Sequence, residues 1–152
     1  MADSQRTLVL LKPDAVQRGL VGAIVTRLEN IGLRIAGMKL IQMDDALARR
    51  HYADLSGKPF FERLVSFISS APLVAMVLEG PRAPEVVRKA MGETDPADSP
   101  TGSIRGDLGL TIGMNLIHGS DAPETAAREI DLFFEPSELL PYTRDIDRWI
   151  LE

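Results

Sequence analysis

Four short apolar runs, separated by segments with helical spacing, constrain the fold of this chain most strongly. The runs comprise residues 7–11, 33–43, 72–78 and 115–118. Apolar runs of this length, bounded by turn residues, are typical of buried strands. A helical segment follows the first and the third run, so strand–helix–strand occurs twice along the chain. This order predicts an α+β fold of the ferredoxin-like βαββαβ type, in which helices cover a four-stranded antiparallel sheet.

Start and stop signals of helices lie between the runs. Residues 21–31 carry apolar side chains at helical spacing, and Gly32 is the expected stop. Three aspartates, Asp14, Asp45 and Asp121, stand where the N-cap residues of further helices are expected. Because an N-cap carboxylate accepts a hydrogen bond from a free N–H of the first turn, each of them is predicted to fix the start of a helix.

Two further segments lie between the second and the fourth run. Phe60, Leu64, Phe67 and Ile68 form a stripe at helical spacing, which predicts a helix with Phe60 and Leu64 in the core. The segment 92–113 contains five glycines and two prolines and has weak periodicity. It predicts a long irregular loop before the last strand. Loops of this length inside a compact domain are usually functional or held by a neighbour.

Length and composition limit the class of protein. A chain of 152 residues is expected to form a single domain, 1–152, and its 45% apolar and 26% charged residues are ordinary values for a globular protein. The net charge of −5 gives no sign of a nucleic-acid surface. The absence of cysteine excludes disulfides, thiolate metal sites and a cysteine nucleophile. No apolar run has the length of a membrane span, and we expect a cytoplasmic protein.

His118 lies between the last apolar run and a predicted helix. Asp121, with Glu124 three residues later, has the pattern of an N-cap and its capping-box partner. The N-terminus of a helix carries partial positive charge and free N–H groups, which suit an anion such as phosphate. An imidazole beside an anion site can act as general base, metal ligand or phosphate-accepting nucleophile. A purely structural histidine is the simpler interpretation of this stretch alone.

Cationic and neutral donors are scattered along the chain ahead of this histidine. Lys12 follows the first apolar run, Arg88 lies in a predicted helix, and Arg105 lies in the glycine-rich segment, together with Thr94; Asn115 opens the last run. Guanidinium groups match phosphate oxygens in bidentate geometry, and a lysine adds a compact charge. Each residue alone is typical of a solvated surface. Their positions at strand exits and in an unusual loop favour a phosphate site without deciding it.

The common nucleotide and hydrolase motifs are absent from the sequence. No GxGxxG follows a predicted strand, and the Walker-like residues 32–39 have Met38 where the lysine belongs. There is no G-x-S-x-G motif of a serine hydrolase. His51 and His118 are far apart in the sequence and lack HExxH spacing, so no zinc site is expected. Phosphate chemistry would therefore require a non-Walker arrangement.

The residues around the histidine also resemble those of a known family. Asn115 to Asp121 (NLIHGSD) resembles the N-x-x-H-G-S-D signature of nucleoside diphosphate kinases. Four other segments match the family in order and spacing: Thr7 to Val16 (TLVLLKPDAV), Lys58 to Phe61 (KPFF), Gly92 to Ser99 (GETDPADS) and Ile104 to Asp107 (IRGD). The resemblance covers essentially the whole chain.

The resemblance implies an enzyme that transfers the γ-phosphate of a nucleoside triphosphate, typically ATP, to a nucleoside diphosphate. The mechanism would be ping-pong through phosphohistidine at His118, and the reaction would balance cellular NTP and dNTP pools. By matching position, the catalytic residues would be Lys12, Tyr52, Asn115, His118, Ser120 and Glu129. The nucleotide-binding residues would be Lys12, Phe60, Leu64, Arg88, Thr94, Arg105, Ile112 and Asn115.

The resemblance also assigns individual roles. Lys12, Arg88, Arg105 and Thr94 would hold phosphates, and Lys12 would also contact ribose hydroxyls, as would Asn115. Phe60 would stack on the base, between Leu64 and Ile112. This assignment competes with the core position that the helical stripe predicts for Phe60. Tyr52 would lie close to the imidazole, which Ser120 and Glu129 would orient. Glu129 lies two helical turns beyond Asp121, so spacing alone does not bring it to His118.

Cofactor and assembly are implied in the same way. Mg²⁺ would be bound with the nucleotide phosphates, without metal-ligating residues of the protein. Pro96 and the tail ending at Glu152 resemble hexameric members, so a homohexamer is favoured over a tetramer. The aromatic residues Tyr142 and Trp149 indicate that the tail docks onto this subunit or another. No membrane partner is expected, and no nucleic acid is required.

The sequence departs from the family pattern at a few positions and leaves two other functions to consider. Many family members have arginine at the position of Met114, and Leu108 and Gly109 also differ from common choices. A regulatory relative could bind nucleotide without efficient transfer, and a ferredoxin-like binding module could lack catalysis altogether. The presence of His118 with its matching partners argues against both, because a binding module needs no nucleophile.

Overall fold

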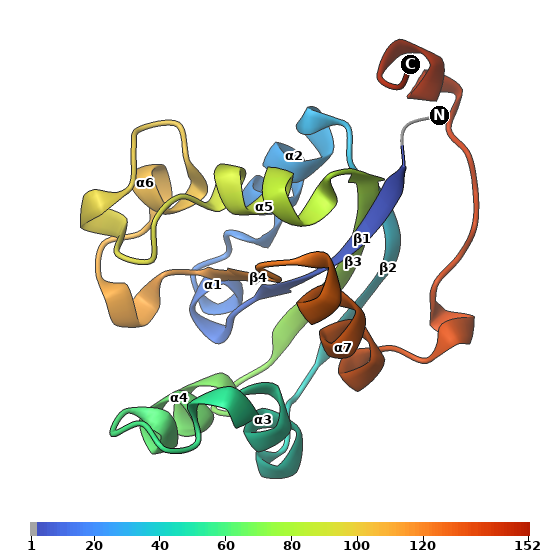
Figure 1. Cartoon of the computed structure of the whole chain (residues 1–152). Helices are drawn as coiled ribbons and strands as arrows, with labels where there is room; N and C mark the ends of the chain where they lie inside the picture. Colours follow the sequence, from blue (N-terminus) through green and yellow to red (C-terminus); the bar gives the residue numbers. More distant parts are fainter. Residues whose placement is uncertain (1–2) are drawn as a thin grey trace.

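The computed structural model describes residues 3–152 and contains a four-stranded antiparallel sheet with the strand order β2-β3-β1-β4 (Figure 1). The strands are β1 (Ser4–Leu11), β2 (Arg34–Ile41), β3 (Leu73–Pro81) and β4 (Ile117–Gly119). β1 lies in the centre and pairs with both β3 and β4, whereas β2 is an edge strand. The predicted ferredoxin-like α+β fold is confirmed.

Helices cover both faces of this sheet. They are α1 (Pro13–Gln17), α2 (Val21–Ile31), α3 (Asp45–His51), α4 (Phe61–Ile68), α5 (Ala83–Met91), α6 (Ile104–Leu108) and α7 (Pro123–Phe133). Figure 1 shows α2 and α5 on one face of the sheet and α3, α4 and α7 on the other. Short 3₁₀ turns cover 53–55, 96–98, 112–114, 136–138 and 145–149.

Alternate residues of β1 enter two separate hydrophobic cores. Val9 and Leu11 belong to the cluster that includes residues of α2 and α5. Leu8 and Leu10 belong to the cluster beneath α3, α4 and α7. Because successive side chains of a strand point to opposite faces, one buried strand serves both cores. The continuous apolar run at 7–11 therefore indicated correctly that this strand is covered on both sides.

Two of the predicted N-caps are each wrong by one residue. Asp44 caps α3, and its Oδ1 accepts a hydrogen bond of 2.7 Å from the N–H of Leu47. The prediction placed the cap at Asp45, which lies in the first turn instead. At α7 the N-cap residue is Ala122 rather than Asp121, and no side chain caps the helix. Pro lies in the first turn there, where its missing N–H costs no hydrogen bond.

Asp14, the third predicted N-cap, has a different role. It lies inside α1, whose N-cap residue is Lys12, and no side chain caps this helix. Its Oδ2 instead accepts a hydrogen bond of 3.0 Å from the N–H of Leu116. Asp14 therefore fixes the segment that leads into β4, more than a hundred residues further along the chain.

The segment 92–113 is more ordered than the predicted irregular loop. It contains α6 and the 3₁₀ turn at 96–98, and a second 3₁₀ turn begins at its end. Ser103 caps α6, and its Oγ accepts a hydrogen bond of 2.9 Å from the N–H of Gly106. A Cβ at Gly106 would lie 2.1 Å from the carbonyl oxygen of Pro100, so only glycine fits there. The short helix escaped prediction because its five residues cannot show a helical period.

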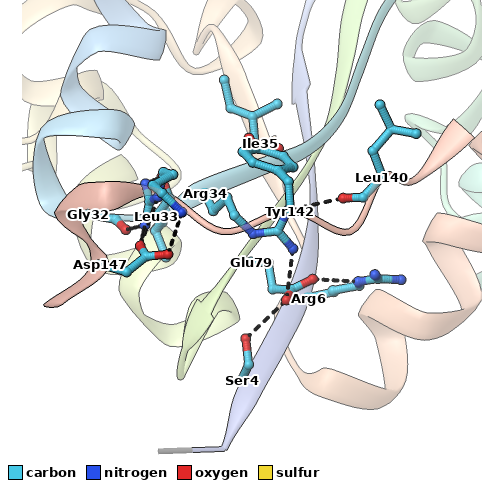
Figure 2. Close-up of polar contacts among 11 residues, drawn as sticks. Ser4, Arg6, Gly32, Leu33, Arg34, Ile35, Glu79, Leu140, Tyr142 and Asp147 are labelled. Atoms are coloured by element: carbon cyan, nitrogen blue, oxygen red, sulfur yellow. Dashed lines mark hydrogen bonds and ion pairs between the residues drawn. The ribbon is translucent and has the colours of Figure 1, made fainter. Parts of the chain in front are cut away.

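The C-terminal tail folds back along the edge strand β2 (Figure 2). The Tyr142 hydroxyl donates to the carbonyl of Ile35, and Arg34 donates to the carbonyl of Leu140. Arg34 also pairs with Glu79 at 3.0 Å, which in turn pairs with Arg6. The tail thus docks onto its own subunit at Tyr142.

Candidate active site

His118 is the middle residue of β4 and pairs in register with Leu10 of the central strand. Its Nε2 lies 3.0 and 3.1 Å from the two carboxylate oxygens of Glu129. α7 runs back along β1, and this course brings the buried Glu129 to the histidine. The predicted contact between these two residues is therefore present in the structure.

Ser120 completes the support of the Glu129 carboxylate. Its hydroxyl donates to Glu129 Oε1 at 2.7 Å and accepts a hydrogen bond of 3.2 Å from the N–H of Leu8. Burial raises the pKa of Glu129, but the hydrogen bond and charge of His118 and the hydrogen bond from Ser120 outweigh it. The pKa of Glu129 is therefore lowered overall, and the group is a carboxylate at neutral pH. We call His118, Ser120 and Glu129 the histidine half of the site.

The orientation of the imidazole decides which of its nitrogens is free. The carboxylate is an acceptor only, so Nε2 carries the proton that it shares with Glu129. In the neutral ring the other nitrogen, Nδ1, then keeps its lone pair. The His118 side chain is 26% exposed. A partly exposed imidazole with a free Nδ1 and a carboxylate behind it is suited to act as a nucleophile or base.

His51 lies directly behind this group, although sequence reasoning did not place it there. The ring centroids of His51 and His118 are 4.7 Å apart in an edge-on arrangement. His51 is only 6% exposed, and neither of its ring nitrogens has a hydrogen-bond partner within residues 3–152. Burial, helped by the charge of His118, lowers the pKa of His51 to about 3. His51 is therefore a neutral imidazole at every pH at which the protein is expected to work.

Tyr52 follows His51 at the end of α3, and its ring centroid is 4.7 Å from that of His51. Burial, and then the negative charge of Glu129, raise the pKa of Tyr52 to about 12. The phenol therefore keeps its proton and can donate a hydrogen bond. The sequence did offer a signal for His51: it directly precedes Tyr52, which was expected near His118, so His51 could also be expected near the active site.

The cations come from three other segments: the end of β1, α5 and α6. Lys12 follows β1, and its Nζ donates to Asn115 Oδ1. The amide nitrogen of Asn115 donates in turn to the backbone carbonyl of Thr94 at 2.8 Å. Burial lowers the pKa of Lys12 to about 8; the nearby charge of Asp14 opposes this shift and that of Arg105 adds to it. Lys12 and Asn115 thus link β1 to the segment that follows α5.

Arg105 of α6 is bound almost entirely by backbone carbonyls. Its Nε donates to the carbonyl of Asn115 at 3.1 Å, and its Nη2 donates to that of Ile117 at 2.6 Å. Nη1 makes two longer hydrogen bonds, to the carbonyls of Gly92 and Glu93. The residue is 6% exposed, and burial, then the charge of Arg88, lower its pKa to about 10. Arg105 therefore ties the glycine-rich segment to β4.

Arg88 of α5 is exposed and donates to the carbonyl of Gly119 at 3.3 Å. Its charge lowers the pKa of Arg105, and the charge of Arg105 lowers that of Lys12. The three cations are therefore close enough to repel one another. We call Lys12, Arg88 and Arg105 the cation half of the site. Clustered cations whose contacts are mostly neutral carbonyl and amide oxygens form a favourable place for an anion.

The backbone turns sharply between the two halves. Leu116 has a φ of 73°, a left-handed conformation that a non-glycine residue rarely adopts. Its N–H is held by Asp14 and its carbonyl accepts a hydrogen bond of 2.9 Å from the N–H of Lys12. This turn ends the extended chain, so β4 begins at Ile117 rather than at the predicted Asn115. Strain of this kind clusters at functional sites.

The residues expected to form the base-binding slot are not core residues. The buried side chains of α4 are Phe61, Val65 and Ile68, so the predicted stripe is correct at Ile68, whereas Phe60 and Leu64 each precede a buried residue by one position. Phe60 is 39% exposed, and Ile112 is also exposed, whereas Leu64 is half-buried. In Figure 1, the segment around α6 lies above β4 and α4 lies below it, both toward the left of the view.

Comparisons with known proteins agree with one another. A family model described as nucleoside diphosphate kinase matches residues 5–139. A nucleoside diphosphate kinase of Thermomicrobium roseum is 60% identical over 147 residues, which cover 97% of this chain and 99% of the relative. A nucleoside diphosphate kinase of Natronomonas pharaonis is 55% identical over 153 residues, covering both chains completely.

Solved structures give the same result. A halophilic nucleoside diphosphate kinase of Halobacterium salinarum, in complex with CDP, superimposes with a TM-score of 0.96 at 51% identity. The match covers 99% of this chain and 100% of that one. A nucleoside diphosphate kinase family protein of Babesia bovis gives a TM-score of 0.93 at 40% identity, covering 96% of this chain and 99% of that one.

Proposed function

We propose, from the premise that this chain belongs to the nucleoside diphosphate kinase family and is an enzyme of that kind, that His118 carries a phosphoryl group between two nucleotides. The γ-phosphate of a nucleoside triphosphate, typically ATP, would pass to His118 and then to a nucleoside diphosphate. Such an enzyme would balance the NTP and dNTP pools. One observation carries the proposal: the Glu129 carboxylate holds Nε2 of His118 and leaves Nδ1 free, while Arg88 and Arg105 bind the backbone carbonyls of the two residues that flank it, Gly119 and Ile117.

In the first half-reaction, the lone pair of Nδ1 attacks the γ-phosphorus in line. The bond from phosphorus to the bridging oxygen breaks, and the nucleoside diphosphate leaves with that electron pair. The ring becomes positively charged, and the carboxylate of Glu129, 3.0 Å from Nε2, stabilises this charge. In the second half-reaction, a terminal oxygen of another nucleoside diphosphate attacks phosphorus, and the N–P bond breaks.

The cation half would hold the phosphates during both steps. Phosphoryl transfer requires positioning and neutralisation of charge on the equatorial oxygens, which Lys12, Arg88 and Arg105 can supply. Arg105 keeps an N–H on Nη2 beyond the one that binds Ile117, so it can donate to phosphate while it holds the loop. Asn115 would hold Lys12 in place and contact ribose hydroxyls, and Thr94 would add a neutral donor to the phosphates.

The same residues fit a nucleotide that carries its own Mg²⁺. Within residues 3–152, the one cluster of three potential ligands is His51, His118 and Glu129. It offers two nitrogens and one oxygen, whereas Mg²⁺ demands oxygen ligands in octahedral geometry. Mg²⁺ would therefore be held by phosphates and water, where it neutralises part of their charge.

The exposed ring of Phe60 would stack on the base, with Leu64 and Ile112 beside it. The complex of the halophilic relative with CDP supports a nucleoside diphosphate as a ligand of this chain. Stacking uses the face of the base, which all bases share. We therefore expect little discrimination between bases.

We also propose that the chain forms a homo-oligomer, with a hexamer favoured over a tetramer. The exposed apolar side chains Met38 and Leu40 on the edge strand β2, with Leu110 and Trp149 elsewhere, support assembly. Light scattering of the purified protein would distinguish the two assemblies. No helix within residues 3–152 is long and apolar enough to cross a membrane. Because its nucleotide substrates occur in the cytoplasm, we place the enzyme there.

The proposal is tested by brief incubation of the protein with Mg²⁺ and γ-labelled ATP in the absence of an acceptor. The expected result is an acid-labile, base-stable label on His118, which a chase with GDP or CDP removes equally well. His118→Gln should fold and bind nucleotide but take no label. A wild-type protein that binds nucleotide without being labelled would contradict the proposal and favour a regulatory relative.

A further inference from the structure

A cluster of potential metal ligands lies behind the nucleophile. His51, His118 and Glu129 come from α3, β4 and α7, and each offers one ligand atom within 4.8 Å of the others. His118 Nε2 is 3.0 Å from Glu129 Oε2, and His51 Nδ1 is 3.7 Å from the same oxygen. Three distant parts of the sequence thus deliver two imidazoles and a carboxylate to one point.

His51 is the unexplained member of this cluster. Its side chain is 1% exposed, yet neither ring nitrogen has a hydrogen-bond partner in the described residues 3–152. The 3.7 Å separation from Glu129 is too long for a hydrogen bond. Buried polar atoms without partners are rare in native proteins, and each one calls for a reason. Phosphoryl transfer, as proposed above, uses His118 and Glu129 but gives His51 no role.

We propose that His51, His118 and Glu129 form a site for a transition-metal ion such as Zn²⁺, and that occupation of this site inhibits phosphotransfer. Two histidines and a carboxylate, with one position left for water, are a common zinc ligand set. Tetrahedral geometry with bonds of about 2.0–2.1 Å places ligand atoms roughly 3.3 Å apart. The observed separations of 3.0 and 3.7 Å lie on either side of this value.

The ligand types separate this ion from the Mg²⁺ of the nucleotide. Mg²⁺ selects oxygen atoms, whereas imidazole nitrogens suit zinc, copper and nickel. An excess of Mg²⁺ is therefore not expected to compete for the cluster. The partly exposed His118 is the side from which an ion can reach the buried His51.

Inhibition follows from the nitrogen that the metal takes, and this step rests on the proposed function. A metal bound to Nε2 of His118 displaces the proton that Nε2 shares with Glu129. In the neutral ring that proton moves through water to Nδ1. Nδ1 then has no lone pair for the γ-phosphorus, and Glu129 is turned from the ring to the metal. The metal thus removes both features on which transfer depends.

Binding is tested without any nucleotide, on the full chain, with Co²⁺ and Zn²⁺ as probes. We expect one ion per chain, the intense visible bands of tetrahedral Co²⁺, and loss of these bands when Zn²⁺ is added. His51→Phe removes one ligand and keeps a flat ring, and Glu124→Gln is a control on the exposed face of the same helix as Glu129. Zn²⁺ affinity, measured by competition with a chromogenic chelator, should fall at least about 100-fold in His51→Phe. Loss of a direct ligand should cost at least as much affinity as loss of a residue that only hydrogen-bonds to a ligand. Zn²⁺ affinity should stay unchanged in Glu124→Gln.

Two outcomes would overturn the site: octahedral Co²⁺ spectra, or equal Zn²⁺ affinity in wild type and His51→Phe. Circular dichroism checks that the variant is folded. If it is not, Glu129→Gln serves in its place, with the same loss expected and retained affinity as the contradicting result.

Inhibition is tested separately, by labelling of His118 with γ-labelled ATP in excess Mg²⁺. Zn²⁺ should halve the amount of label at the concentration that half-fills the site and abolish it at saturation, and a zinc-selective chelator should restore it. Full labelling with the site occupied would overturn the inhibitory role while leaving the metal site. Absence of labelling without Zn²⁺ would instead contradict the proposed function, so the two failures are distinguishable.

Discussion

The histidine half and the cation half of the site both contact β4 but are held by opposite kinds of partner. His118 is bound by a charged side chain, Glu129, which Ser120 supports in turn. Arg105 is bound by four neutral backbone carbonyls, and Arg88 by one. A carboxylate offsets positive charge, whereas a carbonyl positions a guanidinium and leaves its full charge in place. Under the proposed function, negative charge would support the ring that becomes positive, and the positive charge of the cation half would face the phosphates.

Arg105→Leu, a substitution in the cation half, should produce the largest loss of stability. Four carbonyls lose their donor, and a buried unsatisfied acceptor costs about 1–3 kcal/mol, so we expect the free energy of unfolding to fall by about 3 kcal/mol. Chemical denaturation measures this change. Arg88→Leu is the matched control, because the exposed Arg88 makes a single 3.3 Å hydrogen bond. It should weaken nucleotide binding with little loss of stability. Equal losses of stability in both variants would contradict the structural role of Arg105.

Glu129→Gln tests the histidine half. The substitution keeps the shape and hydrogen-bonding capacity but removes the negative charge beside Nε2. We expect the rate of His118 phosphorylation to fall by about 100-fold, as when one group that stabilises a transition state is removed. Single-turnover labelling measures this rate, and Glu124→Gln is the control on the same helix. An unchanged rate would show that the carboxylate only positions the ring.

The pH dependence of kcat/KM tests whether the positive charge of Lys12 is needed for nucleotide binding. Its pKa in the folded protein is about 8, chiefly because of burial, against 10.5 for an ordinary lysine. As pH rises through 8, the free enzyme loses this charge, so kcat/KM should decline with an apparent pKa near 8. The unfolded chain binds more protons between pH 8 and 10.5, so the contribution of Lys12 to stability rises over this window.

Lys12→Met should abolish both pH effects, and the exposed Lys58→Met should preserve them. A profile that stays flat from pH 7 to 10 in the wild type would show that Lys12 is not a phosphate ligand. Nucleotide binding measured by calorimetry over the same range separates the effect on affinity from that on chemistry.

Tyr142→Phe should have the smallest effect, because the tail lies outside both halves. It removes the hydrogen bond to the carbonyl of Ile35, and the free energy of unfolding should fall by about 1 kcal/mol. The rate of His118 labelling should not change. A slower labelling rate would mean that the edge strand and tail influence the site.

The fold was predictable because it depends on apolar periodicity, which is a property of the sequence. Four runs gave four strands, and the order of elements gave the sheet. The fourth strand was placed too early because the left-handed turn at Leu116 depends on a hydrogen bond that Leu116 donates to Asp14 and on one that it accepts from Lys12, and both partners are distant in sequence. The N-cap of α3 is Asp44 rather than the predicted Asp45, because two adjacent aspartates compete for this position, whereas at Ala122 of α7 no side chain caps the helix.

The site was less accessible to sequence reasoning than the fold. Lys12 and His118 lie at the ends of predicted strands, so the sequence alone indicated that both could belong to one phosphate site. Glu129 was assigned only by family resemblance, because spacing does not show that α7 runs back along β1. His51 was missed for the same reason: its contact with His118 joins α3 to β4 through the tertiary packing.

The most direct test of the account is to identify which nitrogen of His118 carries the phosphoryl group. Phosphorus–nitrogen coupling, measured by NMR on ¹⁵N-histidine-labelled enzyme after brief incubation with MgATP, distinguishes the two isomers. Because Glu129 holds Nε2, we predict phosphorylation at Nδ1 alone. Phosphorylation at Nε2 would contradict the account, since the contact with Glu129 would then have to break before the chemistry begins.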